Sequence, residues 1–196
     1  MRNVVVVNNI TLDGVMQSPA ANDEDPRGGF QHGGWAVPYN DEVKGREMGK
    51  GMAREGAMLF GKHTYEHFYK VWHGRTDNPF SPVLDNGHKY VASTTLKEPL
   101  VWQNSTLLKG DIPDAVAELK RQRGGGDIVI LGSGVLIRSL AARDIIDRYV
   151  LLIHPIILGS GQRLFDAKGA LAKFDLESSV PTTKGVIIAT YQRTLT

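Results

Sequence analysis

Short apolar strands alternate with helical segments along this chain, and this alternation constrains its fold more than any other feature. Strands that alternate with helices form a mostly parallel sheet with helices on both faces. The last three expected strands have no helix between them, so the sheet should become antiparallel at that edge. We expect strands at residues 4–7, 57–60, 89–92, 105–108, 127–131, 148–153, 174–178 and 185–193, and helices at residues 41–54, 63–72, 111–123 and about 134–142.

The length and the composition favour one globular domain. The chain has 196 residues, of which 41% are hydrophobic and 22% are charged, and these fractions are ordinary for a folded protein. No linker, composition shift or internal repeat divides the sequence. We therefore expect residues 1–196 to form a single domain.

Charge and residue usage exclude several classes of protein. The net charge is only +2, and the densest basic cluster, residues 120–123, is more typical of a solvated helix end than of a nucleic-acid patch. The absence of cysteine excludes a disulfide framework and a zinc deaminase with cysteine ligands. No apolar stretch approaches the roughly 18 residues of a membrane span. We therefore expect a cytoplasmic protein that binds neither a membrane nor nucleic acid.

Two histidines raise the alternative of a metal site. His63 and His67 lie four residues apart on one expected helix, as zinc ligands can. No third ligand is evident, and the intervening residues do not have the metalloprotease order. We therefore expect no metal.

Two strand-to-helix junctions share one pattern. Gly61 ends one strand before a helix that starts near Lys62, and Gly132 ends another strand before Ser133 and the next helix. Each glycine lets the backbone approach a ligand closely, and the free N–H groups of a helix N-terminus bind anions, phosphates above all. Because ligands bind at the carboxyl ends of strands in an open parallel sheet, the two junctions suit the phosphates of a dinucleotide. The alternative is that each glycine is only a turn residue.

The end of the strand at residues 89–92 bears on the choice of dinucleotide. Sites selective for NAD place a carboxylate at a strand end, where it binds the ribose 2′-hydroxyl. Here Ser93, Thr94 and Thr95 follow the strand with no acidic residue, and Lys62 is expected on the adjacent rim. Hydroxyl groups and a cation suit a 2′-phosphate, so the sequence favours NADP.

A long segment follows the first strand. Residues 11–38 are rich in Gly, Pro and Asp, and a loop of this length in a compact domain is usually a lid or a disordered segment. Its polar composition predicts that it packs poorly and closes over substrate when ligands bind. Trp35 lies in this segment and is the tryptophan expected to touch substrate.

Several motifs resemble the dihydrofolate-reductase-like family, and in particular the C-terminal reductase domain of the bifunctional riboflavin-biosynthesis deaminase-reductases. The segment F-G-K-H-T-Y-E at residues 60–66 resembles the motif by which dihydrofolate reductases hold the cofactor phosphates. The segments T-L-D-G at 11–14, L-G-S-G-V-L at 131–136, I-I-D at 145–147 and H-P-I-I-L-G-S-G-Q-R-L-F at 154–165 resemble the riboflavin reductase domain. The similarity covers nearly the whole chain.

The resemblance implies a three-layer sandwich with a dihydrofolate-reductase-like sheet and NADPH bound across the two glycine junctions. It implies that Gly61, Lys62 and Thr64 hold phosphates. It places Ser93 and Thr94 beside the adenosine end of the cofactor.

The resemblance also assigns the pyrophosphate, the substrate side and the assembly. The pyrophosphate falls to Gly132, Ser133, Gly134, Val135 and Leu136. Asp13 and Gly14 fall beside the nicotinamide, next to the substrate. A homodimer is implied, formed through the strands at 148–153 and 185–193, which are long, apolar and in need of cover.

Two positions and one segment depart from the family pattern. Arg148 stands where members often carry Glu, and residues 65–70 replace the acidic, proline-containing substrate motif of the riboflavin reductases. The folate enzymes carry an acid shortly after a Trp-x-x-Pro element, but here Asn40 is near that position. The proton donor is then Asp41 or Glu42 with a pKa raised by burial, or a bound water.

These observations lead to two main hypotheses. The first is an NADPH-dependent oxidoreductase that reduces a C=N or C=O bond of a small heterocycle, pterin-like or aminopyrimidine-like. The second is a nucleotide-binding protein of the same fold that has lost catalysis. A structural domain that binds a partner protein is disfavoured, because such a domain has no need of two paired glycine junctions.

Overall fold

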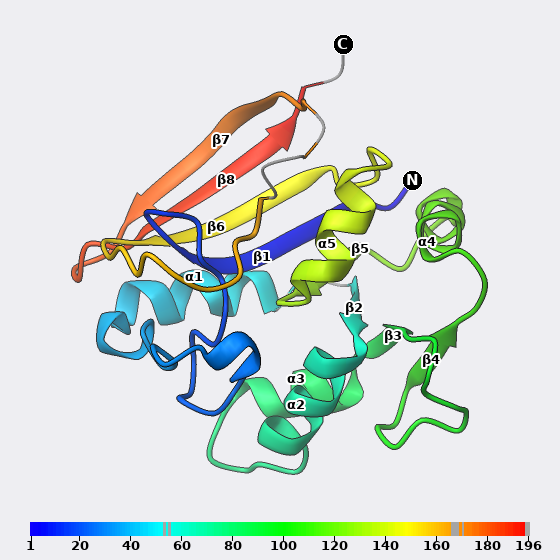
Figure 1. The fold of residues 1–196 in the computed structure, drawn as a ribbon. Helices are drawn as coiled ribbons and strands as arrows, with labels where there is room; N and C mark the ends of the chain where they lie inside the picture. The colour runs from blue at the N-terminus through cyan, green and yellow to red at the C-terminus, as the bar shows by residue number, and fades with distance from the viewer. Residues whose placement is uncertain (53, 55, 166–168, 170, 195–196) are drawn as a thin grey trace.

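The computed structural model describes residues 1–52, 54, 56–165, 169 and 171–194. Its strands form one continuous sheet (Figure 1) in the order β4-β3-β2-β5-β1-β6-β8-β7. The strands are β1 (Val4–Thr11), β2 (Gly56–Gly61), β3 (His88–Ala92), β4 (Ser105–Leu108), β5 (Asp127–Leu131), β6 (Arg148–His154), β7 (Phe174–Pro181) and β8 (Ile187–Arg193).

Five α-helices connect these strands in the described part of the chain. They are α1 (Glu42–Met52), α2 (Lys62–Trp72), α3 (Phe80–Asn86), α4 (Ile112–Arg121) and α5 (Gly134–Ala141). Two short 3₁₀ turns, Arg27–Gly29 and Val37–Tyr39, lie between β1 and α1. The sequence predicted every α-helix except α3.

The pairing of the strands confirms the expected sheet. The six strands from β4 to β6 in the sheet order pair in parallel, whereas β8 pairs antiparallel with both β6 and β7. The antiparallel edge therefore consists of the last three strands, which no helix separates. The outermost strand is β7. The two strands that were expected to need cover are β6 and β8, and they lie between β7 and the parallel part of the sheet.

Helices cover both faces of the sheet. Leu59 and Phe60 are consecutive residues of β2, so their side chains point to opposite faces. Leu59 belongs to the core cluster that includes α4 and α5, whereas Phe60 packs with α2 and α3. Met48 of α1 and Val7 of β1 pack against the same third cluster. Val7 and Val6 are consecutive, so Val7 points away from the first cluster, and α1 covers the same face as α2 and α3. The predicted three-layer arrangement is confirmed.

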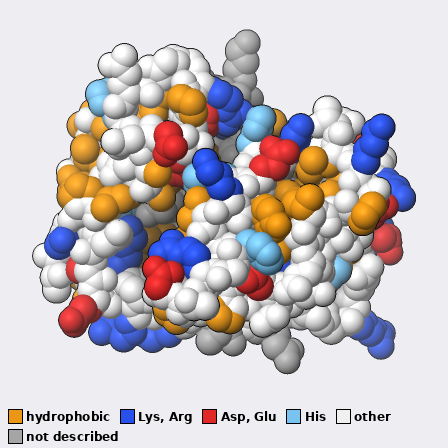
Figure 2. All heavy atoms as spheres, turned by 90° about the horizontal axis from the view of Figure 1, so that it is seen from below, with side chains coloured by type: hydrophobic (Ala, Val, Ile, Leu, Met, Phe, Trp, Pro, Cys, Tyr) orange, Lys and Arg blue, Asp and Glu red, His pale blue; other side chains and the backbone are white. Residues whose placement is uncertain are grey.

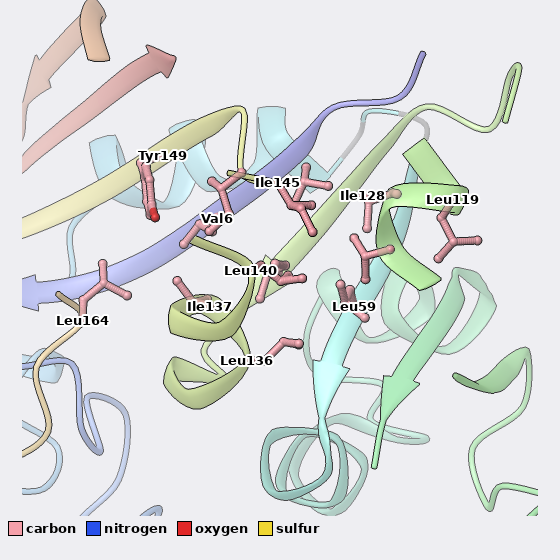
Figure 3. Packing of buried hydrophobic residues seen from close by; sticks show 14 of the residues in the cluster. Val6, Leu59, Leu119, Ile128, Leu136, Ile137, Leu140, Ile145, Tyr149 and Leu164 are labelled. Carbon is pink, nitrogen blue, oxygen red and sulfur yellow. The ribbon is translucent and has the colours of Figure 1, made fainter. Parts of the chain in front are cut away.

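The largest core cluster lies between the sheet and the pair α4 and α5. Figure 3 shows Leu119 of α4 and Leu136 and Leu140 of α5 directed at the strands that carry Val6 and Ile128. The spacing of Leu136 and Leu140 by four residues places both on one side of α5. This packing fixes α5, and with it the junction at its N-terminus, against β5 and β1.

The segment between β1 and α1 packs more closely than its composition predicts. Val15, Gln17, Ser18, Trp35 and Ala36 are buried. The indole N–H of Trp35 donates a hydrogen bond to the carbonyl of Gln17 at 2.7 Å. The expectation of poor packing is wrong, because these buried polar groups satisfy one another within the segment and against the neighbouring loop.

The surface carries charges of both signs. On the face shown in Figure 2, basic and acidic side chains lie intermixed, with hydrophobic side chains between them. Such a mixture is typical of a solvated surface. Among the described residues, no helix has both the length and the apolar character that a membrane crossing requires.

Candidate functional site

The two glycine junctions lie side by side at the carboxyl ends of β2 and β5, which are neighbours in the sheet. The backbone N–H of Gly61 donates a hydrogen bond to Ser133 Oγ at 2.9 Å. A β-carbon built on Gly132 would lie 3.2 Å from Thr64 Cγ2. The fold therefore brings together four of the predicted phosphate-binding residues from distant parts of the sequence.

The backbone of the second junction presents free N–H groups. Gly132 has a φ of 64° and Ser133 a φ of 60°, so both are left-handed before α5 begins. The first-turn N–H groups of α2 and α5 have no partner within their helices. Since Gly132 lacks a side chain, the space that a β-carbon would fill beside Thr64 stays open. The backbone of Gly132 and Ser133 and the side chain of Thr64 thus form a cradle that fits a pyrophosphate.

Lys62 connects the first junction to the turn after β3. Its Nζ donates to Thr95 Oγ1 at 3.0 Å, which confirms the predicted proximity of the lysine to this turn. Ser93 Oγ accepts hydrogen bonds from the N–H groups of Thr95 and Leu96 at 3.1 and 3.0 Å, so this hydroxyl shapes the turn. Thr94 is exposed. The rim thus combines a cation with hydroxyl groups.

The three residues after Ser133, Gly134 to Leu136, differ in which of their atoms a ligand can reach. The space beside Gly134 is filled by Met16, whose Sδ would lie 2.7 Å from a β-carbon on the glycine. The side chain of Val135 is 65% exposed, at the rim of the junction. Leu136 is buried in the core, so it offers a ligand only its backbone.

Asp13 joins the turn after β1 to the loop after β6. Its carboxylate accepts hydrogen bonds from Thr11 Oγ1 at 2.6 Å and from the N–H of Gly159 at 2.9 Å, and it pairs with Arg163 at 3.4 Å. The hydrogen bond from Thr11 is the main cause that lowers the pKa of Asp13 to about 2. Gly14, with a φ of 79°, allows the chain to turn here. Asp13 therefore fixes this corner of the site through internal contacts.

Trp35 is packed against the end of β6. Its ring meets the ring of His154 edge-on, with 5.1 Å between the centroids, and the residue is only 6% exposed. Tyr39 meets the same imidazole edge-on at 5.5 Å. The two aromatic rings form a wall around His154 on the α1 side of the sheet.

Asp41 is not the buried acid that the sequence suggested. Its carboxylate accepts hydrogen bonds from the N–H of Lys44 at 2.8 Å, the hydroxyl of Thr183 at 2.7 Å and the N–H of Lys184 at 3.2 Å. These bonds, led by that from Lys44, lower the pKa of Asp41 to about 2. The expectation of a raised pKa is therefore wrong, because the carboxylate caps α1. Glu42, the alternative donor, is exposed at the first turn of α1.

Three polar residues that the sequence reasoning missed lie on the α1 side at the ends of β1 and β6. They are Asn9, Lys44 and His154. His154 is the first residue of the motif at 154–165, so the sequence could have indicated this residue. Asn9 is the second of two asparagines after a run of valines, where polar residues indicate the end of a strand, although β1 continues to Thr11.

The fold is that of the dihydrofolate-reductase-like proteins, as the sequence predicted. Residues 2–188 match the family described as "RibD C-terminal domain", and the chain belongs to that family. A protein of Bacillus subtilis (strain 168), described as "Uncharacterized protein YyaP", is 30% identical over 112 residues. That match spans 55% of this chain and 58% of the relative.

Two solved structures share the fold. A putative riboflavin biosynthesis protein from Shewanella sp. PV-4 has a TM-score of 0.71 and 24% identity, and the match covers 98% of this chain and 99% of that one. A pyrimidine reductase-like protein from Corynebacterium diphtheriae has a TM-score of 0.67 and 13% identity, covering 100% of this chain and 93% of that one. At these identities the two structures show the shared fold, and membership of the family supports a reductase-type function.

Proposed function

We propose that this protein is an NADPH-dependent reductase that acts on a C=N or C=O bond of a small heterocycle, pterin-like or aminopyrimidine-like. The observation that carries the proposal is the hydrogen bond between the N–H of Gly61 and Ser133 Oγ. It holds two helix N-termini together, as the linked phosphates of a dinucleotide require. Membership of the RibD C-terminal domain family supports the reductase chemistry. The proposed enzyme is a single cytoplasmic domain.

The chain has residues suited to the phosphates of the cofactor. Thr64 and the cradle at Gly132 and Ser133 suit the phosphates next to the nicotinamide, and Lys62 suits the 2′-phosphate. When bound, the nicotinamide supplies the hydride, whereas the protein supplies position, electrostatics and exclusion of water.

We expect the protein to bind NADPH about 10- to 150-fold more tightly than NADH, because a charge-assisted contact contributes roughly 1.5–3 kcal/mol. Lys62→Glu should remove this preference by weakening NADPH far more than NADH. Isothermal titration of both nucleotides measures the effect. Lys70→Glu, at the other end of α2, is the matched control and should keep the preference. Equal binding of NADH and NADPH by the wild-type protein would contradict the prediction.

A second candidate is a nucleotide-binding protein without catalysis. The ionised state of Asp41 favours it, since this carboxylate cannot donate a proton at neutral pH. Steady oxidation of NADPH in the presence of a panel of pterins and pyrimidines distinguishes the two functions. Nucleotide binding without turnover of any member of the panel favours the second.

We also propose a homodimer formed through the antiparallel edge. Leu176 of β7 is 56% exposed and Ile187 of β8 is 46% exposed. Apolar side chains on an exposed edge need cover, which a second copy of the edge provides. Light scattering at micromolar concentration should give twice the mass of one chain, and Leu176→Asp should shift the protein towards the monomer. A monomeric wild-type protein would refute the proposal.

A further inference from the structure

We propose that Lys44 donates the proton that the reduction requires and that His154 is the positioning residue that holds its ammonium group. The inference rests on the reductase function proposed above and supplies the donor that it lacks. Hydride addition to the carbon of C=O leaves an electron pair on oxygen, which must take up a proton. Asp41 is ionised and Glu42 is exposed, so neither is suited to this step.

Lys44 carries a partly buried ammonium group. Its Nζ donates to Asn40 Oδ1 at 3.0 Å and contacts His154 Nε2 at 3.4 Å. No ion pair between described residues includes this lysine. Because an ammonium group has three N–H donors, one N–H of Lys44 has no acceptor among the described residues. That donor is available to a substrate.

His154 is built to accept a hydrogen bond from Lys44. Its side chain is fully buried, and its Nδ1 lies 2.9 Å from the carbonyl oxygen of Leu152. A carbonyl oxygen only accepts, so Nδ1 carries the proton and Nε2 presents its lone pair to Lys44. Burial, reinforced by the charge of Lys44, lowers the pKa of His154 to about 4. The imidazole is therefore neutral at pH 7 and holds the ammonium group without competing for its proton.

His154 lies at the carboxyl end of β6, two strands from the second junction in the sheet. The strands β2, β5, β1 and β6 are neighbours in that order, and His154 is in register with Thr11 at the end of β1. Asn8 of β1 contacts the carbonyl of Gly132 at 3.5 Å, so β1 adjoins the second junction, although Asn8 points to the face of the sheet opposite to His154. Neighbouring strands are about 4.8 Å apart, which puts β6 roughly 10 Å from β5. The pair and the second junction therefore lie along the same edge of the sheet, where a bound nucleotide and its substrate would meet.

An unpaired acceptor lies on the same face. Thr11 is in register with His154, and Asn9 is two residues earlier on β1, so Asn9 and His154 share a face of the sheet. Asn9 Oδ1 is buried and has no hydrogen-bond partner among the described residues. Buried acceptors without a donor are rare, and a ring N–H of a heterocycle would satisfy this one. The α1 side of the sheet thus carries both an unpaired acceptor and a proton donor.

The proposed step balances in atoms and electrons. A bound nicotinamide would supply a hydride, with its two electrons, to the carbonyl carbon. The π electron pair would move to oxygen, and the oxygen would take a proton from Lys44 Nζ. The products are an alcohol, the oxidised nucleotide and a neutral lysine that regains its proton from solvent. Burial lowers the pKa of Lys44, although Asp41 opposes the shift, and a less basic amine releases its proton more readily.

The test compares a substrate whose reduction requires a proton with one whose reduction requires only a hydride. 4-Chromanone, a heterocyclic ketone, gains a proton on oxygen when it is reduced, whereas the N-methyl dihydroisoquinolinium cation becomes a neutral amine by hydride addition alone. Lys44→Met should lower the rate of ketone reduction by about 100-fold or more and change iminium reduction less than about threefold. Lys50→Met, on the exposed side of the same helix, is the control and should change neither rate. Equal loss of both rates, or retention of ketone reduction, overturns the proposal.

Two variants of His154 test its positioning role. His154→Gln keeps an acceptor for Lys44 and should retain more ketone reduction than His154→Phe, while both variants should reduce the iminium at similar rates. A purely structural disturbance would instead lower both reactions in parallel. Equal ketone rates for the two variants would refute the positioning role.

A measurement without turnover separates this inference from the proposed function. Nitrogen NMR of the wild-type protein at neutral pH should show His154 protonated on Nδ1 and unprotonated on Nε2, with the Nε2 signal shifting in Lys44→Met. A proton on Nε2 overturns the contact and the inference. NADPH titration of the same samples should give equal affinities. Failure of the wild-type protein to bind NADPH contradicts the proposed function, while the NMR result still tests the contact.

Discussion

Gly132→Val is expected to weaken NADPH binding by at least about 100-fold, or roughly 2.7 kcal/mol. A β-carbon at this position would lie 3.2 Å from Thr64 Cγ2, so the valine side chain fills the cradle that the phosphates need. The left-handed φ of 64° also disfavours a β-branched residue. Titration with NADPH measures the loss, and circular dichroism checks that the fold remains.

The control for Gly132→Val separates backbone strain from loss of the cradle. Gly110 has a φ of 77°, and a β-carbon on this glycine would have no neighbouring atom within 4 Å. Gly110→Val therefore introduces comparable strain away from the junctions, and it should lose thermal stability but bind NADPH like the wild type. If Gly132→Val also binds NADPH normally, the cofactor does not use this cradle.

Lys89→Met should lower the free energy of unfolding by about 2–4 kcal/mol, because each buried acceptor left without a donor costs roughly 1–3 kcal/mol. Lys89 is fully buried, and its Nζ donates to the carbonyls of Leu84, Asp85 and Gly87 at 2.8, 3.2 and 2.7 Å. The ammonium group also lies 4.6 Å from the centroid of the Trp102 ring. Methionine fills the space but satisfies none of the three carbonyls.

Denaturant unfolding at neutral pH measures the effect of Lys89→Met. Lys97→Met, an exposed lysine in the turn after β3, is the matched control and should change stability by less than about 0.5 kcal/mol. A loss below about 1 kcal/mol for Lys89→Met would show that water replaces the ammonium group at the end of α3.

The elements that the sequence predicted best are those with local causes. The helix α4 starts with Asp111, whose carboxylate accepts from the N–H of Asp114 at 3.0 Å, and it carries an apolar stripe at Val116 and Leu119. All of these features lie within one short segment. In contrast, α3 was missed, because its last carbonyls are satisfied by Lys89 from the next strand.

The sequence predicted which residues form the two junctions of the candidate site, but it did not predict the contacts between them. The glycines and the serine of the two junctions can be recognised from the sequence, whereas the bond between Gly61 and Ser133 exists only because β2 and β5 become neighbours. The error at Asp41 has the same origin. Its bonds to Thr183 and Lys184 come from the turn before β8, which no local pattern reveals.

The attachment of the segment after β1 determines which part of it can open. Val15 bridges to Arg163, the N–H of Met16 donates to the carbonyl of Gln162 at 2.9 Å, and Gln17 Oε1 accepts from the N–H of Gln162 at 2.9 Å. With the first residues of the segment held in this way, any hinge lies beyond Gln17. Met16, which fills the space beside Gly134, is therefore held in place at the cofactor junction. A nucleotide bound there would keep this wall even when residues beyond Gln17 rearrange to admit a substrate.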